Sequence, residues 1–226
     1  MAMFTRREWF VTTGALAGAL AIQRPVNTQA GVLRLYIARH GETDWNVQKK
    51  VTGTTDIPLN ARGRAQASML HETLRGITLD AVYCSTLSRS METARVAAPT
   101  MMATRLADLA EQNQRRFQGG RNDTVEFLRR HADPDDTLDG GESLNQLTAR
   151  VRRALDRIRR EHTSGNVLIV AHNITNKMVL RVLLDLDVRK AMTIDQANDE
   201  VYLVELQSGL RPRAWKLIRD SNLGDL

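Results

Sequence analysis

Two histidines stand at equivalent points of the sequence, each just after a short apolar run. His40 follows "LYIA" and Arg39, and His172 follows "VLIVA". Continuous apolar runs without alternation are typical of strands that are buried on both faces of a parallel sheet. Ligand sites in open α/β sheets lie outside the carboxyl ends of such strands. The two imidazoles are therefore predicted to share one site at that edge of a sheet.

Two arginines accompany the histidines. Arg39 directly precedes His40, and Arg89 comes shortly after the run "VYC". Guanidinium groups match phosphate oxygens and repel a divalent cation. The histidines also lack the helical His-x-x-x-His spacing of zinc enzymes, and the one cysteine, Cys84, is expected to be a small buried side chain. These residues predict a phosphate pocket without a metal, where a neutral imidazole can attack phosphorus and guanidinium groups hold the charged oxygens.

Strand-like apolar runs alternate with helical patterns along the rest of the chain. This alternation predicts an α/β fold, a doubly wound, mostly parallel sheet flanked by helices on both faces. The long polar stretch at about 112–142 is expected to form a small helical cap. His71, His131 and His162 lie in or beside charge-rich helical stretches and are expected at the surface. The predicted helices cover about 60–74, 88–98, 124–131, the segment after the capping box of Ser143 and Gln146, and about 174–184.

The first thirty residues differ in composition from the rest of the chain. An arginine pair, Arg6 and Arg7, precedes a weakly apolar stretch from Phe10 to Ile22, and "TQA" ends at Ala30. This order is typical of an export signal, and "TRREWF" resembles a twin-arginine signal. Residues 1–30 are therefore predicted to engage the twin-arginine translocation machinery, which would place the protein in the periplasm or at the membrane face. Residues 31–226 are predicted to form one domain.

Composition restricts the kinds of partner. The chain has 226 residues and a formal net charge of +6, which raises the question of nucleic-acid binding. Aromatic residues make up only 4% of it, so stacking platforms for bases are scarce. Many of the arginines also fall on the polar side of a helical pattern, as in Arg150, Arg153 and Arg157. A small phosphorylated substrate is expected, nucleic acid is not, and the oligomeric state is left open.

Several segments, in order, resemble the histidine phosphatase superfamily, the phosphoglycerate mutase-like clan. "RHGETDWN" resembles its signature, and the similarity continues over about residues 32–206. The further segments are "GTTDIPLNARGRAQA", "VYCSTLSRSMETA", "LAEQNQRRFQGG", "GGES" and "VLIVAHN". A lone Arg-His-Gly is a weak signal, whereas these segments in this order are a strong one.

The resemblance implies a role for each matching position. His40 would be the nucleophile that forms a phosphohistidine, and Glu111 would protonate the leaving oxygen and then take a proton from water. The phosphoryl group would be bound by Arg39, Arg89 and His172, with Asn46 as a further contact. No metal and no cofactor are implied. Asp108 is an alternative acid nearby, and Asn46 could instead cap the next helix.

The sequence departs from the family at two places. Asn173 follows the second histidine where the family usually has glycine, so its amide could reach the phosphate or it could adopt a left-handed backbone. Arg115 and Phe117 replace the usual glycine and tryptophan near the acid. Arg115 and Arg116 lie where a cap would cover the pocket, so a substrate with a second negative group is conceivable.

The function expected from these features is metal-independent hydrolysis of a phosphomonoester. A phosphoglycerate mutase is the alternative within the family. A binding module that senses phosphorylated ligands without turnover is the alternative from another class, and the presence of a candidate acid argues against it.

Overall fold

A computed structural model describes residues 4–8 and 31–219. Strands and helices alternate as the sequence predicts, and two 3₁₀ turns, η1 and η2, lie between β4 and α4. No described helix is long and apolar enough to cross a membrane. In chain order the elements are β1 (Phe4–Glu8), β2 (Leu33–Arg39), α1 (Asp44–Val47), α2 (Ala61–Thr73), β3 (Ala81–Cys84), α3 (Ser88–Ala97), β4 (Thr104–Arg105), η1 (Ala107–Leu109), η2 (Arg115–Phe117), α4 (Val125–His131), α5 (Leu144–Glu161), β5 (Gly165–Ala171), α6 (Asn173–Leu184), α7 (Val188–Met192), β6 (Val201–Leu206) and β7 (Arg213–Arg219).

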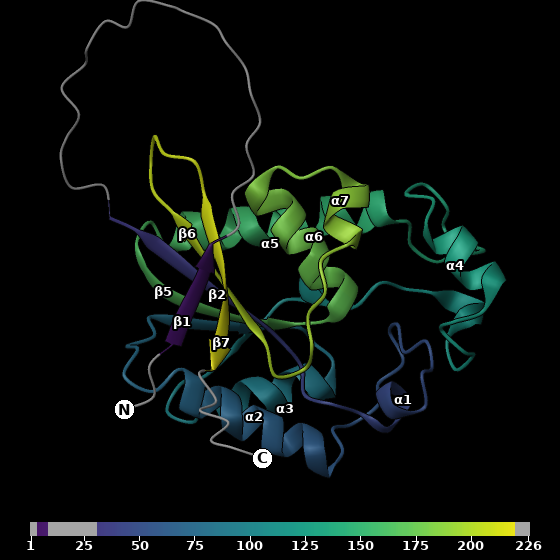
Figure 1. Ribbon diagram of the computed structural model, residues 1–226, viewed down its shortest axis with the longest axis horizontal. Coiled ribbons are helices and arrows are strands. Elements are labelled where there is room, and N and C mark those ends of the chain that lie inside the picture. Colours follow the sequence, from purple (N-terminus) through teal and green to yellow (C-terminus); the bar gives the residue numbers. More distant parts are fainter. Residues whose placement is uncertain (1–3, 9–30, 220–226) are drawn as a thin grey trace, which may run out of the picture.

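One sheet organises the molecule, with the strand order β1-β7-β6-β2-β5-β3-β4. The strands β2, β5, β3 and β4 are parallel, and β6 pairs with β2 in the antiparallel sense. Helices α2 and α3 cover one face of the sheet, while α5 and α6 cover the other (Figure 1). The predicted doubly wound, mostly parallel fold is therefore confirmed.

Alternate residues of the central strands enter two separate cores. Leu35 and Ile37 of β2 pack with α5 and α6, whereas Tyr36 and Ala38 pack toward α2 and α3. This division explains why the strands read as continuous apolar runs, because both faces are covered. Cys84 lies in the second core as expected, and burial raises the pKa of its thiol to about 11.

The cap projects from the sheet and has a small core of its own. Its apolar cluster consists of Val51, Phe117, Phe127 and Leu138, and α4 lies well away from the sheet (Figure 1). His131, which was expected at the surface, is buried here, so that prediction was wrong. Its ring stacks on Phe127 with centroids 5.0 Å apart, and burial lowers its pKa to about 4.

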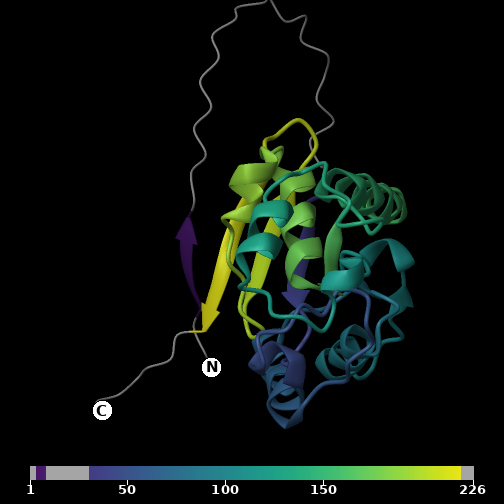
Figure 2. The same ribbon diagram turned by 90° about the vertical axis from the view of Figure 1, so that its right-hand side faces the viewer.

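The N-terminal segment contributes one described strand. β1 pairs with β7 in the antiparallel sense, with Arg6 opposite Leu217 and Arg7 opposite Lys216, at the edge of the sheet (Figure 2). The apolar stretch and "TQA" of the predicted signal lie outside the described residues. The export signal therefore stays a prediction.

Candidate active site

The two histidines come together because their strands are neighbours. β2 and β5 are parallel with Arg39 opposite Ala171, so His40 and His172 leave the same edge of the sheet. The backbone N–H of His40 donates to the carbonyl of Ala171 at 3.0 Å. The two ring centroids are 5.0 Å apart, and both side chains are buried. The predicted convergence of the imidazoles is thus seen in the structure.

The ring of His40 is oriented by its own loop. Its Nδ1 lies 2.7 Å from the carbonyl oxygen of Gly41, which can only accept, so we assign the proton to Nδ1 and the lone pair to Nε2. Burial lowers the pKa of His40 well below 6.5, and the charges of Arg89 and Arg39 lower it further. The ring is therefore neutral at physiological pH, with Nε2 available as a nucleophile.

Glycine at position 41 permits a close approach between this loop and α2. A Cβ atom on Gly41 would lie 2.2 Å from the carbonyl oxygen of Gly63. A Cβ on Gly63 would meet the carbonyl oxygen of Glu42 at 2.1 Å. Both positions therefore need glycine to hold the loop that carries His40 against the helix.

His172 is the N-cap residue of α6 and is fully buried. Its Nε2 lies 2.7 Å from the hydroxyl of Ser85, whereas its Nδ1 has no hydrogen-bond partner. If the hydroxyl donates to Nε2, the ring proton lies on Nδ1, which can then donate to a phosphate oxygen. Burial, followed by the charge of Arg89, holds the pKa of His172 well below 6.5.

Arg89 is fully buried and is held by backbone carbonyls. Its Nη1 and Nη2 donate to the carbonyls of Thr55 and Gly53, each at 2.8 Å, and its Nε points to Nε2 of His40 at 3.3 Å. Burial lowers the pKa of Arg89 to about 10, so the group stays charged at neutral pH. The guanidinium is therefore fixed beside the nucleophilic nitrogen, with further N–H groups left to bind an anion.

Arg39 is anchored at one end of its guanidinium. Its Nη1 donates to the carbonyl of Gln196 at 3.0 Å, while its Nε is buried without a partner. Burial lowers its pKa, and nearby Glu111 and Asp195 act in the opposite direction. A buried donor without a partner is costly and rare, so this atom is suited to receive an oxyanion.

Glu111 is buried at the N-terminus of α6. Its Oε1 accepts from the backbone N–H groups of Gln112 at 3.0 Å and Thr175 at 3.1 Å, and its Oε2 accepts from Ile174 at 3.3 Å. These contacts place the carboxyl group of Glu111 at the helix N-terminus that His172 caps. The alternative acid, Asp108, points instead to Arg153, with 2.9 Å between Oδ1 and Nη2. The geometry therefore favours Glu111 over Asp108.

The side-chain oxygens of the two predicted asparagines, Asn46 and Asn173, differ in their hydrogen bonds. The Oδ1 of Asn46 accepts from the N–H of Thr43 at 3.0 Å and closes the capping box of α1, so its phosphate contact stays a prediction. Asn173 lies in the first turn of α6 and is not among the described residues with positive φ, so the left-handed alternative was wrong. Its Oδ1 is buried without a partner. Because amide oxygen and nitrogen can exchange places, the same position can present an NH₂ group to an anion.

The two cap arginines are held differently, so the expected contact with a second anionic group stays a prediction. The guanidinium of Arg116 is paired with Glu126 and Asp139, so its charge is balanced. Arg115 donates to the carbonyl of Gly140 at 2.9 Å and has a φ of 45°, the left-handed region that a glycine would adopt more easily.

Several residues that support the site were not identified from the sequence. Ser85 contacts His172, Thr175 donates to Glu111, and Gln196 holds Arg39. Ser85 could have been found, because it directly follows β3 as His40 and His172 follow their strands. The others lie far along the chain from the side chains that they contact, and no local pattern marks them. Among the described residues, no group of three or more His, Cys, Asp or Glu side chains is placed to hold a metal ion.

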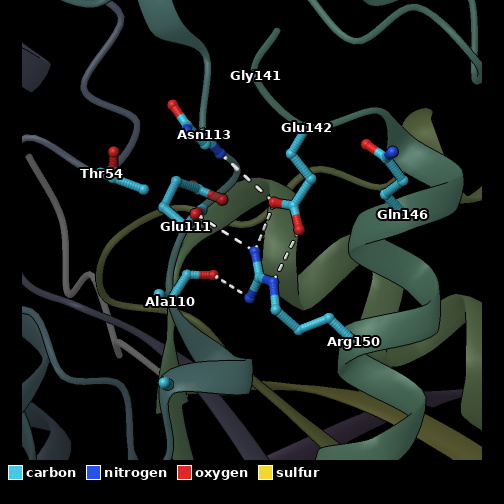
Figure 3. A pocket seen from close by; sticks show the side chains of 9 residues that line it. Thr54, Ala110, Glu111, Asn113, Gly141, Glu142, Gln146 and Arg150 are labelled. Carbon is cyan, nitrogen blue, oxygen red and sulfur yellow. Dashed lines mark hydrogen bonds and ion pairs between the residues drawn. The ribbon is translucent and has the colours of Figure 1, made fainter.

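A pocket of about 360 Å³ opens beside Glu111 (Figure 3). It lies between the loop that follows α1, the segment around Glu111 and the start of α5. Its lining residues are Thr54, Ala107, Ala110, Glu111, Asn113, Gly141, Glu142, Gln146 and Arg150.

The sequence model of the histidine phosphatase superfamily (branch 1) matches residues 35–217. The chain belongs to this superfamily. Among its relatives, the probable phosphoglycerate mutase GpmB of Enterobacter sp. (strain 638) is 28% identical over 185 residues, which cover 78% of this chain and 86% of the relative. The uncharacterized phosphatase PhoE of Bacillus subtilis (strain 168) is 33% identical over 136 residues, 60% of this chain and 69% of the relative.

Solved structures agree on the fold. The native structure of a mycobacterial glucosyl-3-phosphoglycerate phosphatase superposes with a TM-score of 0.73 at 23% identity, covering 83% of this chain and 98% of that one. The histidine phosphatase superfamily, with phosphatases and mutases among these relatives, identifies the protein as an enzyme of the phosphoric monoester hydrolase or mutase type.

Proposed function

We propose that the protein is a metal-independent hydrolase that removes the phosphoryl group from a small phosphorylated metabolite through a phosphohistidine on His40. The observation that carries the proposal is the orientation of His40, whose Nδ1 faces the carbonyl of Gly41 while its Nε2 lies 3.3 Å from Nε of Arg89. A neutral nucleophile with a fixed cation beside it suits attack on a negatively charged phosphorus centre.

The proposed reaction has two steps. Nε2 of His40 attacks phosphorus, the bond to the leaving oxygen breaks, and Glu111 gives that oxygen its proton. Glu111 then takes a proton from water, and the resulting hydroxide breaks the P–N bond and releases inorganic phosphate. Arg39, Arg89 and His172 hold the oxygens of the transferring group, with Asn46 and Asn173 as further contacts.

The His40→Ala variant tests the nucleophile. We expect turnover of p-nitrophenyl phosphate to fall to the uncatalysed background, because alanine has no atom that can take the phosphoryl group at this position. Phosphoenzyme trapped from the wild type should be labile in acid and stable in alkali, as a phosphoramidate is. His71→Ala, an exposed histidine outside the site, is the matched control. Label that survives acid, or that remains in His40→Ala, would contradict the mechanism.

Phosphoglycerate mutase activity is the second candidate, favoured by the similarity to GpmB over 78% of this chain. A mutase keeps water from its phosphohistidine and returns the group to a sugar acid. Incubation with 3-phosphoglycerate and a bisphosphorylated primer separates the two reactions. No 2-phosphoglycerate is expected here, and its accumulation without phosphate release would establish the mutase instead. A binding module without turnover would also release no phosphate from p-nitrophenyl phosphate.

Export by the twin-arginine pathway is a further part of the proposal. The support is the arginine pair, the apolar stretch from Phe10 to Ile22 and the small residues that end at Ala30. An exported mutase would lack its cytosolic primer, so export also favours the hydrolase. In cell fractionation, activity of the native chain should be extracytoplasmic, and Arg6→Lys with Arg7→Lys should trap it inside. Native protein that remains in the cytoplasm with residues 1–30 intact would refute export.

A further inference from the structure

The pocket shares Glu111, the proposed acid, with the proposed active site. Glu111 lines it, and so does Thr54, whose neighbours Gly53 and Thr55 provide the carbonyls that hold Arg89. The leaving oxygen must lie within hydrogen-bond reach of the acid that protonates it. A leaving group bonded to that oxygen therefore extends from Glu111 into this pocket.

The lining of the pocket has one cation, Arg150, and its guanidinium nitrogens all donate hydrogen bonds within the protein (Figure 3). Its Nε and Nη2 donate to the two carboxylate oxygens of Glu142 at 2.8 and 2.6 Å. Its Nη1 donates to the carbonyls of Asp108 and Ala110, both at 2.9 Å. The charge of Arg150 is thus balanced by Glu142, and its remaining donor is bound to backbone carbonyls.

Apart from Glu111 and the ion pair of Arg150 with Glu142, the polar side chains of the lining are uncharged. The hydroxyl of Thr54 donates to Gln118 at 3.1 Å and keeps its lone pairs as acceptors. The Oδ1 of Asn113 accepts from the N–H of Arg115 at 3.1 Å, and Oε1 of Gln146 accepts from Ser143 at 2.9 Å. Neither bond uses the amide NH₂ group. The wall therefore offers both donors and acceptors, which suit hydroxyl groups.

Two cations outside the lining also have partners of their own. Arg116 is paired with two carboxylates, and the amine of Lys177 donates to the carbonyl of Met192 at 3.0 Å. A leaving group with its own carboxylate would thus lie beside Glu111 and Glu142, and the one cation of the lining, Arg150, is already paired with Glu142. Burying a charge under these conditions is unfavourable.

We propose that this pocket selects substrates whose leaving group is an uncharged, hydroxylated alcohol such as a polyol or sugar, with Thr54, Asn113 and Gln146 as the specificity-determining residues. The inference rests on the proposed function and names the substrate class of that site. It also favours a hydrolase over a mutase acting on phosphoglycerate, whose leaving group carries a carboxylate.

Two probes of nearly equal size test the selection. Glycerol 3-phosphate and 3-phosphoglycerate differ in one group, a hydroxymethyl in the first and a carboxylate in the second. Each is measured as a competitive inhibitor of p-nitrophenyl phosphate hydrolysis, which gives an inhibition constant even without turnover. We expect glycerol 3-phosphate to bind the wild type about tenfold or more tightly than 3-phosphoglycerate. Equal inhibition constants, or the reverse order, would overturn the proposal.

A positive charge introduced into the lining should change the ratio of the two inhibition constants. Gln146→Lys should improve inhibition by 3-phosphoglycerate about tenfold relative to glycerol 3-phosphate. Gln146→Glu is the matched control, since glutamate also serves in a capping box, and it should weaken 3-phosphoglycerate binding. Thr54→Lys, at an exposed position away from the cap of α5, provides a second test if Gln146→Lys does not fold. An unchanged ratio in a folded lysine variant would overturn the proposal.

Absence of phosphoenzyme and of p-nitrophenyl phosphate hydrolysis in the wild type would instead refute the proposed function itself.

Discussion

The carboxylate of Glu111 is held by donors from two parts of the chain. One donor is its own neighbour, Gln112, and the others belong to the first turn of α6, directly after His172. This arrangement places the proposed acid and His172, which is proposed to bind the phosphoryl group, at the same helix N-terminus. Its position therefore depends on the same helix that positions His172.

The Glu111→Gln variant tests the role of this carboxylate. Protonation of the leaving oxygen is typically worth about 10²- to 10⁴-fold in rate, and little of it is needed for an activated aryl phosphate. We expect a large loss of kcat on alkyl phosphates and a small loss on p-nitrophenyl phosphate. Asp108→Asn, which changes a carboxylate that points to Arg153, should leave both rates close to wild type. Equal losses on both substrates in Glu111→Gln would indicate a structural role.

A side-chain hydrogen bond connects the end of α4 in the cap to Gln112, the neighbour of the proposed acid. Nε2 of His131, at the end of α4, lies 2.7 Å from Oε1 of Gln112, which is an acceptor, so we assign the ring proton to Nε2. The amide of Gln112 donates in turn to the carbonyl of Glu142 at 2.7 Å. Because the backbone N–H of Gln112 donates to Glu111, a shift of α4 would move this donor relative to the carboxyl group. His131 is thus expected to be a positioning residue.

Removal of this donor should affect the step that needs an acid. In His131→Leu we expect kcat on an alkyl phosphate to fall about tenfold, the value of a 1.4 kcal/mol change in the barrier, with a smaller fall on p-nitrophenyl phosphate. His131→Gln keeps a donor of similar reach and should restore most of the rate. If His131→Leu lowers both rates equally, the bond serves only to hold the cap.

Burial of histidines should make the whole molecule sensitive to acid. The pKa values of His40, His131 and His172 are all lowered by burial, so the unfolded chain binds more protons than the folded one below pH 6.5. The free energy of unfolding should therefore fall as the pH drops below about 6.5, and the loss from each histidine continues until its folded pKa is reached. For His131, whose folded pKa is about 4, the loss at pH 5 is about 2 kcal/mol.

Urea unfolding at pH 7.5 and at pH 5.0 measures this effect. His131→Gln should reduce the difference between the two free energies by about 2 kcal/mol, whereas the control His71→Gln changes an exposed side chain and should leave the difference as in the wild type. A free energy of unfolding that is independent of pH over this range would contradict the burial of these neutral rings.

Features set by neighbouring residues could be determined from the sequence alone. The capping box of Ser143 and Gln146, the cap at Asn60 and the buried strand before each histidine are examples. Hydrogen bonds of a cap span three residues, and the period of apolar side chains repeats within one element, so both are visible locally. The rule that sites lie at the carboxyl ends of parallel strands then brought His40 and His172 together.

Only the tertiary structure decided how the site residues are held and which histidines are buried. Glu111 meets Thr175 across 64 positions of the chain, and Arg89 meets the carbonyl of Gly53 across 36. His131 has a charge-rich sequence around it and is nevertheless buried, because α4, which carries Phe127 and His131, packs on Phe117 in a small core of the cap. Burial and long-range hydrogen bonds arise when separate elements pack, and no residue type or spacing within one element specifies the partner that it will meet.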